Sequence, residues 1–214
     1  MLQVWGYLET LTKNKSAIRV LHNAPEMSVA TAFNFYNNPV VDYVGFDFMV
    51  GPLIYQTTLN EFQFDIGKIP FPDNYFHMII TSHVLEHVPD LKKALSELYR
   101  VLKPGGVGFI AFPATFKNDH TIEDNGELLS DEERTRKFGQ KDHVRVIGRD
   151  ILGLMKSVGF NWDHNRDHKP RGFYQRPHIA SKLKTYKNNE FQSNYNEQVM
   201  FVHKQGRHVP MHMI

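Results

Sequence analysis

The sequence of 214 residues contains no cysteine. It therefore forms no disulfide framework, cysteine-ligated metal centre or cysteine nucleophile, and the absence fits a reducing compartment. A large charge excess is also lacking, because 25 Lys and Arg residues against 23 Asp and Glu residues give a formal net charge of +2. A dedicated nucleic-acid-binding domain shows a strong basic excess. We therefore expect no nucleic-acid partner.

Long apolar runs are missing as well. No stretch of the sequence approaches the roughly 20 apolar residues that a membrane-spanning helix needs. Residues 1–15 lack the basic segment and apolar core of a signal peptide. We expect a cytoplasmic protein with no membrane partner. The length predicts one domain, 1–214, with its core at about 17–162 and 197–205 and a basic insertion without periodicity at about 163–196.

The chain does contain short apolar runs that alternate with helical patterns. Such alternation predicts parallel strand–helix–strand units in an α/β sheet. Helix starts are indicated at residue 2, at Ser28, after Asp90, at Ser130 and near Arg149, and Ser130 with Glu133 has the spacing of a capping box. Strands are expected at 17–22, 40–47, 62–66, 76–82, 107–112 and 197–205, with a further strand beginning near Phe160.

Two acidic residues end successive predicted strands. Asp47 closes the second strand and Asp65 the third. In nucleotide-binding α/β sheets such an acid accepts hydrogen bonds from ribose hydroxyls, since an ionised carboxylate offers only acceptors. Asp is also common in strand-to-helix turns, where it merely caps the turn. The repetition in two units favours a nucleotide site.

The string HVLEH, from His83 to His87, matches the ligand order of one class of zinc hydrolases. Two His residues four apart on a helix could bind Zn²⁺, with Glu86 as the base. Pro89 would interrupt that helix, and the string supplies no third ligand. We therefore predict no metal and interpret the string as a polar turn that faces the substrate. A zinc hydrolase is kept only as a minor alternative.

A second polar group follows in FGQKDHVRVIGRD, which contains Asp142, His143 and Arg145. A loop of this composition could supply a general base and an anion site, because histidine titrates near neutrality. It could equally serve helix capping and surface ion pairing. Residues Tyr99 and Lys103 have the spacing used by short-chain reductases, but no glycine-rich dinucleotide fingerprint follows the first strand.

The segment from Asp65 to Pro113, DIGKIPFPDNYFHMIITSHVLEHVPDLKKALSELYRVLKPGGVGFIAFP, resembles the class I S-adenosyl-L-methionine (SAM)-dependent methyltransferases of the type 11 group. The resemblance implies a Rossmann-like, seven-stranded, mostly parallel sheet with helices on both faces, in a single domain. It also implies one antiparallel strand, at 197–205, and SAM as the cofactor.

Site residues follow from the resemblance position by position. Asp47 would hold the ribose, and Asp65 would accept from the adenine amino group with Ile66 packed beside it. Ser82 and His83 would line the methionine and methyl end. The cofactor-binding residues implied in this way are His22, Ala24, Pro25, Glu26, Asp47, Phe48, Asp65, Ile66, Ser82 and His83.

The first loop departs from the family pattern Glu/Asp-x-Gly-x-Gly-x-Gly, because it reads HNAPEMS. His22 replaces the acid, and Ala24, Glu26 and Ser28 replace the glycines, which normally allow close approach of the backbone to the cofactor. Pro25 also lacks an N–H group. A similar His-x-Ala-Pro-Glu loop is found in a subgroup of the family. We expect Glu26 to pair with the α-ammonium group of SAM.

The predicted function is SAM-dependent methyl transfer to a small-molecule acceptor of anionic or glycan-like character. A module that binds SAM or its product without turnover is the alternative, and the oligomeric state stays open. His143 is the first candidate for the general base, followed by His83 and His87. The predicted acceptor-binding residues are Arg145, Arg171 and Arg176. The last two lie in the basic insertion, which also contains Lys169.

Overall fold

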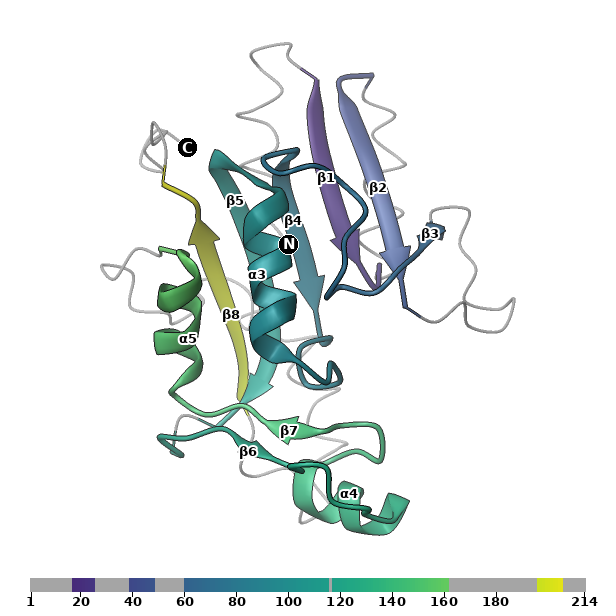
Figure 1. The fold of residues 1–214 in the computed structure, drawn as a ribbon, viewed down its shortest axis with the longest axis vertical. Coiled ribbons are helices and arrows are strands. Elements are labelled where there is room, and N and C mark those ends of the chain that lie inside the picture. The colour runs from purple at the N-terminus through teal and green to yellow at the C-terminus, as the bar shows by residue number, and fades with distance from the viewer. Residues whose placement is uncertain (1–16, 26–38, 49–59, 116, 162–195, 206–214) are drawn as a thin grey trace, which may run out of the picture.

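A six-stranded sheet forms the centre of the computed structural model, which describes residues 17–25, 39–48, 60–115, 117–161 and 196–205 (Figure 1). The strand order is β3-β2-β1-β4-β5-β8, and only the β5–β8 pair is antiparallel. The predicted α/β class, the mostly parallel sheet and the antiparallel last strand are therefore confirmed. The strands are β1 (Ile18–Asn23), β2 (Val41–Asp47), β3 (Asn60–Gln63), β4 (Phe76–Ser82), β5 (Leu102–Ala114) and β8 (Asn196–His203).

The starts of α3 and α4 and the end of α5 lie at residues that the sequence marks. The Asp90 carboxylate accepts a hydrogen bond from the Lys93 N–H and caps α3, and Ser130 and Glu133 form the predicted capping box at α4. Gly159 ends α5 in the left-handed conformation that favours glycine. The bounds are α3 (Leu91–Val101), α4 (Asp131–Phe138) and α5 (Ile151–Val158), with a small antiparallel sheet of β6 (Ile122–Glu123) and β7 (Arg145–Val146).

The main core lies between one face of the sheet and helices α3 and α5 (Figure 1). Helix α3 buries a stripe at helical spacing, and each such aliphatic side chain contributes roughly 1.5–3 kcal/mol when fully removed from water. The rings of Tyr99 and Phe160 meet edge to face at 5.2 Å and join the two helices. The stripe consists of Leu91, Ala94, Leu95, Leu98 and Val101.

The opposite face of the sheet carries a second apolar cluster of Ile18, Val20, Met78 and Ile80. No helix within the described ranges packs on this face. Helices were predicted on both faces of the sheet, and the described helices cover one of them. The predicted helices at residue 2 and Ser28 lie outside the described residues, and so does nearly all of the insertion at 163–196. The division into one core and one insertion stays a prediction.

Strand β5 begins at Leu102, five residues earlier than predicted. Gly105 and Gly106 do not end α3 but lie inside the strand, where the register with β4 shifts between Phe76 and Met78. A Cβ on Gly106 would lie 2.9 Å from the Lys103 carbonyl oxygen and 3.0 Å from that of His77. The glycine is therefore needed for a close approach of the backbone.

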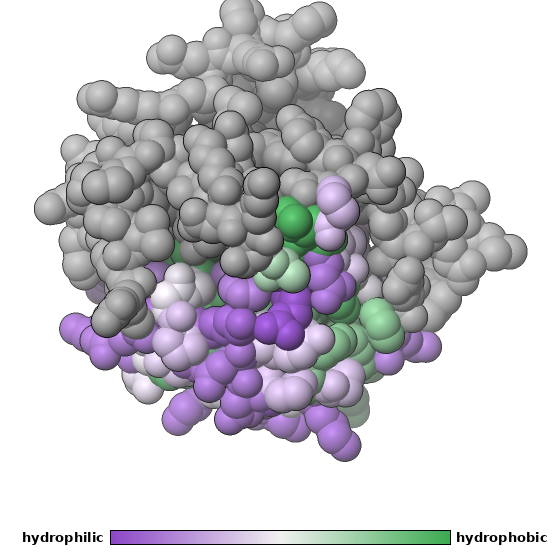
Figure 2. Space-filling model, turned by 90° about the horizontal axis from the view of Figure 1, so that it is seen from above, coloured by the Kyte–Doolittle hydropathy of each residue, from purple (hydrophilic) through white to green (hydrophobic). Residues whose placement is uncertain are grey.

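The central sheet has six described strands, whereas seven were predicted. The expected strand near Phe160 is represented by one antiparallel bridge between Asn161 and His203. In the described part of the chain, no helix has both the length and the apolar character needed to cross a bilayer. Viewed from above, the described surface is mainly hydrophilic, with apolar residues in small patches (Figure 2).

The parallel strands end at the same edge of the sheet, which lies at the bottom of Figure 1. Sheet β6–β7 and helix α4 lie at this edge, next to the end of β5. In open α/β sheets, ligands bind outside the carboxyl ends of the strands. The candidate site is therefore built from the residues that follow β1, β2, β3 and β4.

Candidate functional site

The two predicted acids lie at the carboxyl ends of neighbouring parallel strands. Asp47 is the last residue of β2, and Asp65 follows β3 by two residues. The Phe64 N–H donates to the Asp47 carbonyl oxygen at 3.2 Å, which ties the two segments together. One carboxylate oxygen of Asp65 accepts from the Gly67 N–H at 2.7 Å, and the side chain stays exposed. This turn orients the carboxylate along the strand edge.

Aromatic side chains accompany the two acids. Phe48 is 65% exposed and Phe62 is 42% exposed, which is unusual among the large apolar residues described. Ile66 is buried beneath the same segment. Aromatic faces favour stacking with flat rings, and carboxylates accept from hydroxyl and amino groups. The acceptors and aromatic surfaces at this edge fit a nucleoside.

The described start of the first loop contains one residue with a glycine-like backbone. Ala24 has a φ of 46°, in the left-handed region that favours glycine. Its N–H donates to the Phe46 carbonyl oxygen at 2.8 Å and holds the loop against the end of β2. Pro25 is half-buried beside it. Glu26 lies outside the described residues, so its predicted role stays a prediction.

His22 precedes this loop on β1, and its predicted role in cofactor binding stays a prediction. Its side chain is fully buried, and its Nδ1 lies 2.6 Å from the Tyr43 hydroxyl. Burial lowers the pKa of His22 to about 3, so the ring is neutral. Alternation along β1 places it on the face of Val20. A second buried polar contact joins the Asn23 amide to the Thr81 hydroxyl at 3.4 Å, and no sequence pattern predicted it.

His83 stands at the end of β4, directly after Ser82, as predicted. Its φ of 53° is uncommon for a residue with a side chain, and its N–H donates to the Ala111 carbonyl oxygen at 3.0 Å. The side chain is 50% exposed, with Nδ1 3.4 Å from a carboxylate oxygen of Glu86. Backbone strain of this kind concentrates at functional sites.

A compact polar cluster lies just beyond this turn and consists of Glu86, His87 and His143. Their potential ligand atoms all lie within 4.8 Å of one another. The rings of His87 and His143 meet edge to face at 4.7 Å. Residues 83–88 form a turn and not a helix, as expected from Pro89. The HVLEH string predicted neither the burial of Glu86 nor the approach of His143, because both depend on tertiary contacts.

His143, the first candidate for the general base, is 6% exposed. Its Nδ1 lies 2.9 Å from the Phe138 carbonyl oxygen, which can only accept. His87 is more exposed, and its Nδ1 lies 3.1 Å from the Asp142 carbonyl oxygen. Both rings are therefore oriented by the backbone. Of the three histidines, His83 presents the most exposed ring.

The Arg145 side chain is occupied by contacts within the protein, and its predicted role in binding an anionic acceptor stays a prediction. The side chain is 2% exposed, and its Nε donates to a Glu123 carboxylate oxygen at 2.9 Å. The two terminal nitrogens donate to the carbonyl oxygens of Leu85, Val88 and Pro89. A planar guanidinium suits several acceptors at once. Its function in this fold is to hold the turn after β4.

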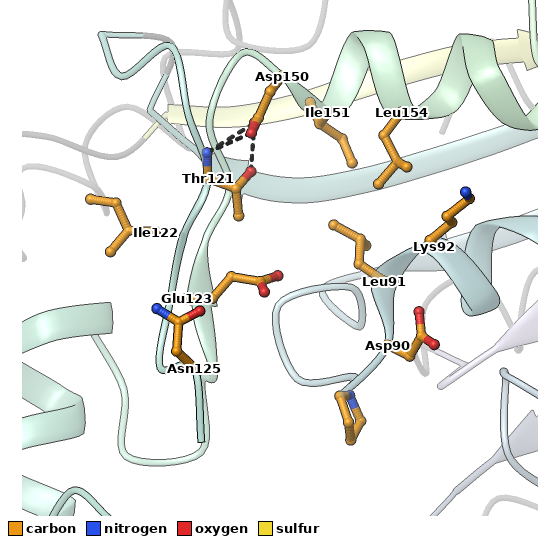
Figure 3. Close-up of a pocket in the computed structure, with 11 residues that line it drawn as sticks. Asp90, Leu91, Lys92, Thr121, Ile122, Glu123, Asn125, Asp150, Ile151 and Leu154 are labelled. Atoms are coloured by element: carbon orange, nitrogen blue, oxygen red, sulfur yellow. Dashed lines mark hydrogen bonds between the residues drawn. The ribbon is translucent and has the colours of Figure 1, made fainter. Parts of the chain in front are cut away.

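Arg171 and Arg176 lie outside the described residues, so nothing described supports an anion site. The described pocket of about 860 Å³ lies between the start of α3, strand β6 and the start of α5 (Figure 3). Both carboxylate oxygens of Asp150 accept from the Thr121 N–H at 2.9 Å. The charged residues in its lining are Asp90, Lys92, Glu123 and Asp150, an acidic balance that does not favour an anion.

Comparison with protein families gives a match over residues 19–110 to a family described as "Methyltransferase domain". A ubiquinone/menaquinone biosynthesis C-methyltransferase of Serratia proteamaculans is 32% identical over 115 residues. That match covers 48% of this chain and 46% of the relative. The chain thus matches about half the length of this relative. The family match over residues 19–110 contains both acids and the turn after β4.

Solved structures share the fold at low sequence identity. A phosphoethanolamine N-methyltransferase of Haemonchus contortus in complex with SAM has a TM-score of 0.57 and 17% identity, covering 89% of this chain and 49% of that chain. A [4+2]-cyclase has a TM-score of 0.59 and 15% identity, covering 89% of this chain and 76% of that chain. At these identities the likeness shows the fold alone.

Proposed function

We propose that this chain, which matches a methyltransferase domain family over residues 19–110, is a SAM-dependent methyltransferase that transfers a methyl group to a small-molecule acceptor. The proposal rests mainly on Asp47 and Asp65, two acids at the ends of neighbouring parallel strands. Exposed aromatic side chains lie close to them in the sequence. SAM is the cofactor, and when bound it supplies an already activated sulfonium methyl group.

The residues at the sheet edge bind and orient this cofactor. Asp47 accepts from the ribose hydroxyls, and Asp65 accepts from the adenine amino group, since both side chains are carboxylates at strand ends. Phe48 covers a face of the adenosine, with Ile66 packed below. The left-handed backbone at Ala24 lets the first loop turn at the end of β1 without glycine. This arrangement supports a variant of the binding loop that still accepts the cofactor.

His83 is the proposed general base. It follows Ser82 at the end of β4, and its ring is half-exposed, whereas the rings of His143 and His87 are oriented by backbone carbonyls. The protein's task is to align the acceptor and to remove its proton. Glu86, 3.4 Å from Nδ1 of His83, would orient the ring.

The acceptor is proposed to be a small molecule without a net negative charge. Arg145 is committed to the turn after β4, and the described pocket has an acidic lining. The relative from Serratia proteamaculans is named for C-methylation in quinone biosynthesis. Hydroxylated ring compounds are therefore the first acceptors to test, ahead of phosphorylated compounds and glycans.

A binding module without turnover is the alternative. It is favoured by the substituted first loop and by the fold's occurrence in a cyclase. Binding of S-adenosylhomocysteine (SAH) without methyl transfer, across an acceptor panel of ring compounds, amines and phosphorylated molecules, would support the module over the enzyme.

Turnover by a His83→Ala variant tests the enzyme proposal. We expect acceptor-dependent release of SAH by the native protein and a 10²- to 10⁴-fold lower kcat, in order of magnitude, for the variant, the usual contribution of a general base. SAH affinity should change little in the variant. His120→Ala, which removes a 91% exposed ring elsewhere, is the matched control. A variant with unchanged kcat would show that His83 is not the base.

A further inference from the structure

We propose that Glu86, His87 and His143 form a binding site for a divalent transition-metal ion, and that Zn²⁺ is the ion that fits it best. The site is separate from the acids that bind the cofactor, and the inference does not depend on methyl transfer. It follows from the position of three ligand atoms, the orientation of two rings and one buried carboxylate oxygen.

The three side chains already converge on one point. One ligand atom from each lies within 4.8 Å of the others, although His143 is 56 or more residues from the other two in the chain. Tetrahedral zinc with ligand distances of about 2.0–2.2 Å holds its ligand atoms roughly 3.3–3.6 Å apart. The ligand atoms would therefore have to move closer to one another by up to roughly 1.5 Å to hold an ion.

Both histidines are held in the orientation that metal ligands require. Nδ1 of His143 lies 2.9 Å from the Phe138 carbonyl oxygen, and Nδ1 of His87 lies 3.1 Å from that of Asp142. A carbonyl oxygen only accepts, so each Nδ1 carries the proton and each Nε2 keeps its lone pair. Metal-binding histidines almost always donate their second N–H group to such an acceptor.

Glu86 supplies the second, independent observation. Its side chain is 1% exposed, and one oxygen, Oε2, has no hydrogen-bond partner in the described part of the chain. The other oxygen lies 3.4 Å from Nδ1 of His83. A buried carboxylate oxygen without a partner costs free energy unless a proton or a cation satisfies it. A cation between Glu86 and the two rings would remove this cost.

Backbone contacts keep the two ligand-bearing segments together. The Val144 N–H donates to the Glu86 carbonyl oxygen at 3.0 Å, directly beside His87 in one segment and His143 in the other. Arg145 donates to the carbonyl oxygen of Leu85 at 2.9 Å and to those of Val88 and Pro89. The segments are thus joined on both sides of the cluster, and the site is largely formed before an ion arrives.

The donor set selects the kind of ion. Two imidazole nitrogens and one carboxylate oxygen suit zinc, whereas magnesium prefers oxygen ligands in an octahedral shell. Three protein ligands also leave at least one coordination position open, as in catalytic zinc sites. The turn that carries Glu86 and His87 begins at His83, so an ion there would lie next to the end of β4.

Calorimetric titration of chelator-treated protein with ZnCl₂ tests the site. We expect one tight Zn²⁺ per chain, at least about 100-fold weaker binding in His87→Asn and Glu86→Gln, and no comparable binding of Mg²⁺, because loss of one of three ligands removes most of the affinity. The matched control is His120→Asn, since its ring is 91% exposed. Equal zinc affinity in the native protein and both ligand variants would overturn the proposal.

A second measurement needs no variant and so does not depend on how a variant folds. Crystals of the zinc-loaded native protein, measured on both sides of the zinc absorption edge, should show an anomalous peak between Glu86, His87 and His143. A peak elsewhere only, or no peak at saturating Zn²⁺, would contradict the site. Binding of SAH, measured separately, tests the methyltransferase proposal, so failure of one leaves the other standing.

Discussion

Individual side chains in the sheet are held neutral by burial. His77 accepts a hydrogen bond from the Arg19 N–H at 3.0 Å through Nδ1, and Nζ of Lys103 lies 3.1 Å from its Nε2. Burial, and then the charges of Lys103 and Arg19, lower the pKa of His77 to about 4. His22 is neutral for the same main reason. These two rings make the fold sensitive to acid.

The free energy of unfolding should therefore fall as the pH decreases from 6.5 towards 4. Above pH 6.5 both states hold His77 neutral, while below it the unfolded chain binds a proton that the folded chain does not. Urea unfolding at pH 7 and pH 5 measures this dependence. We expect a weaker dependence in His77→Gln and an unchanged one in the exposed control His120→Gln. An identical dependence in His77→Gln would contradict the assignment.

Arg145 illustrates that a local sequence pattern does not reveal the hydrogen-bond partners of a side chain. The sequence placed a cation beside His143, and the guanidinium indeed forms multiple charge-assisted hydrogen bonds. Its two terminal nitrogens, however, donate to backbone carbonyls 56 to 60 residues away in the chain. A pattern of neighbouring residues contains no information on such partners. The burial of Glu86 was not predicted, for the same reason.

At the scale of helices and strands, local signals were the most reliable. The Asp90 cap of α3, the capping box at Ser130 and the end of α5 at Gly159 depend on residues three or fewer positions apart, and all are confirmed. The early start of β5 was not predicted, because a Gly-Gly pair after a helical pattern is typical of a helix end. Gly106 instead lies in close contact with the backbone of β4, and Gly105 has a φ of 78°. That contact is set by the sheet and not by the local sequence.

Two glycines, one before α5 and one within it, differ in how much room they leave for a side chain. A Cβ on Gly148 would lie 2.4 Å from the carbonyl carbon of His120, whereas a Cβ on Gly153 would meet nothing within 4 Å. Gly148→Ala should destabilise the protein by about 1–3 kcal/mol, the range for overpacking. Gly153→Ala should stabilise it by up to about 1 kcal/mol, because alanine favours a helix interior.

Thermal unfolding of the two glycine variants checks this pair, each serving as the control for the other. The melting temperature should fall in Gly148→Ala and stay equal or rise in Gly153→Ala. The reverse order would show that the segment from His120 to Thr121 does not pack against Gly148 as described.

For the whole molecule, the order of strands and helices predicted the fold class well. Parallel units with right-handed crossovers leave few alternatives, so the carboxyl edge could be located before the structure. The site was predicted in part. Asp47, Asp65 and His83 lie at this edge, while His22 faces the interior and Arg145 the turn after β4. What could not be predicted are contacts between segments distant in sequence.

The central claim is that the carboxyl edge binds the adenosine part of SAM, and calorimetric titration with SAH tests it most directly. We expect the native protein to bind one SAH per chain and Asp47→Ala to bind it at least about 10-fold more weakly, since a charge-assisted hydrogen bond contributes roughly 1.5–3 kcal/mol. Asp119→Ala, at an 81% exposed carboxylate, should bind as the native protein does. No SAH binding by the folded native protein, or equal affinity in Asp47→Ala, would contradict the account.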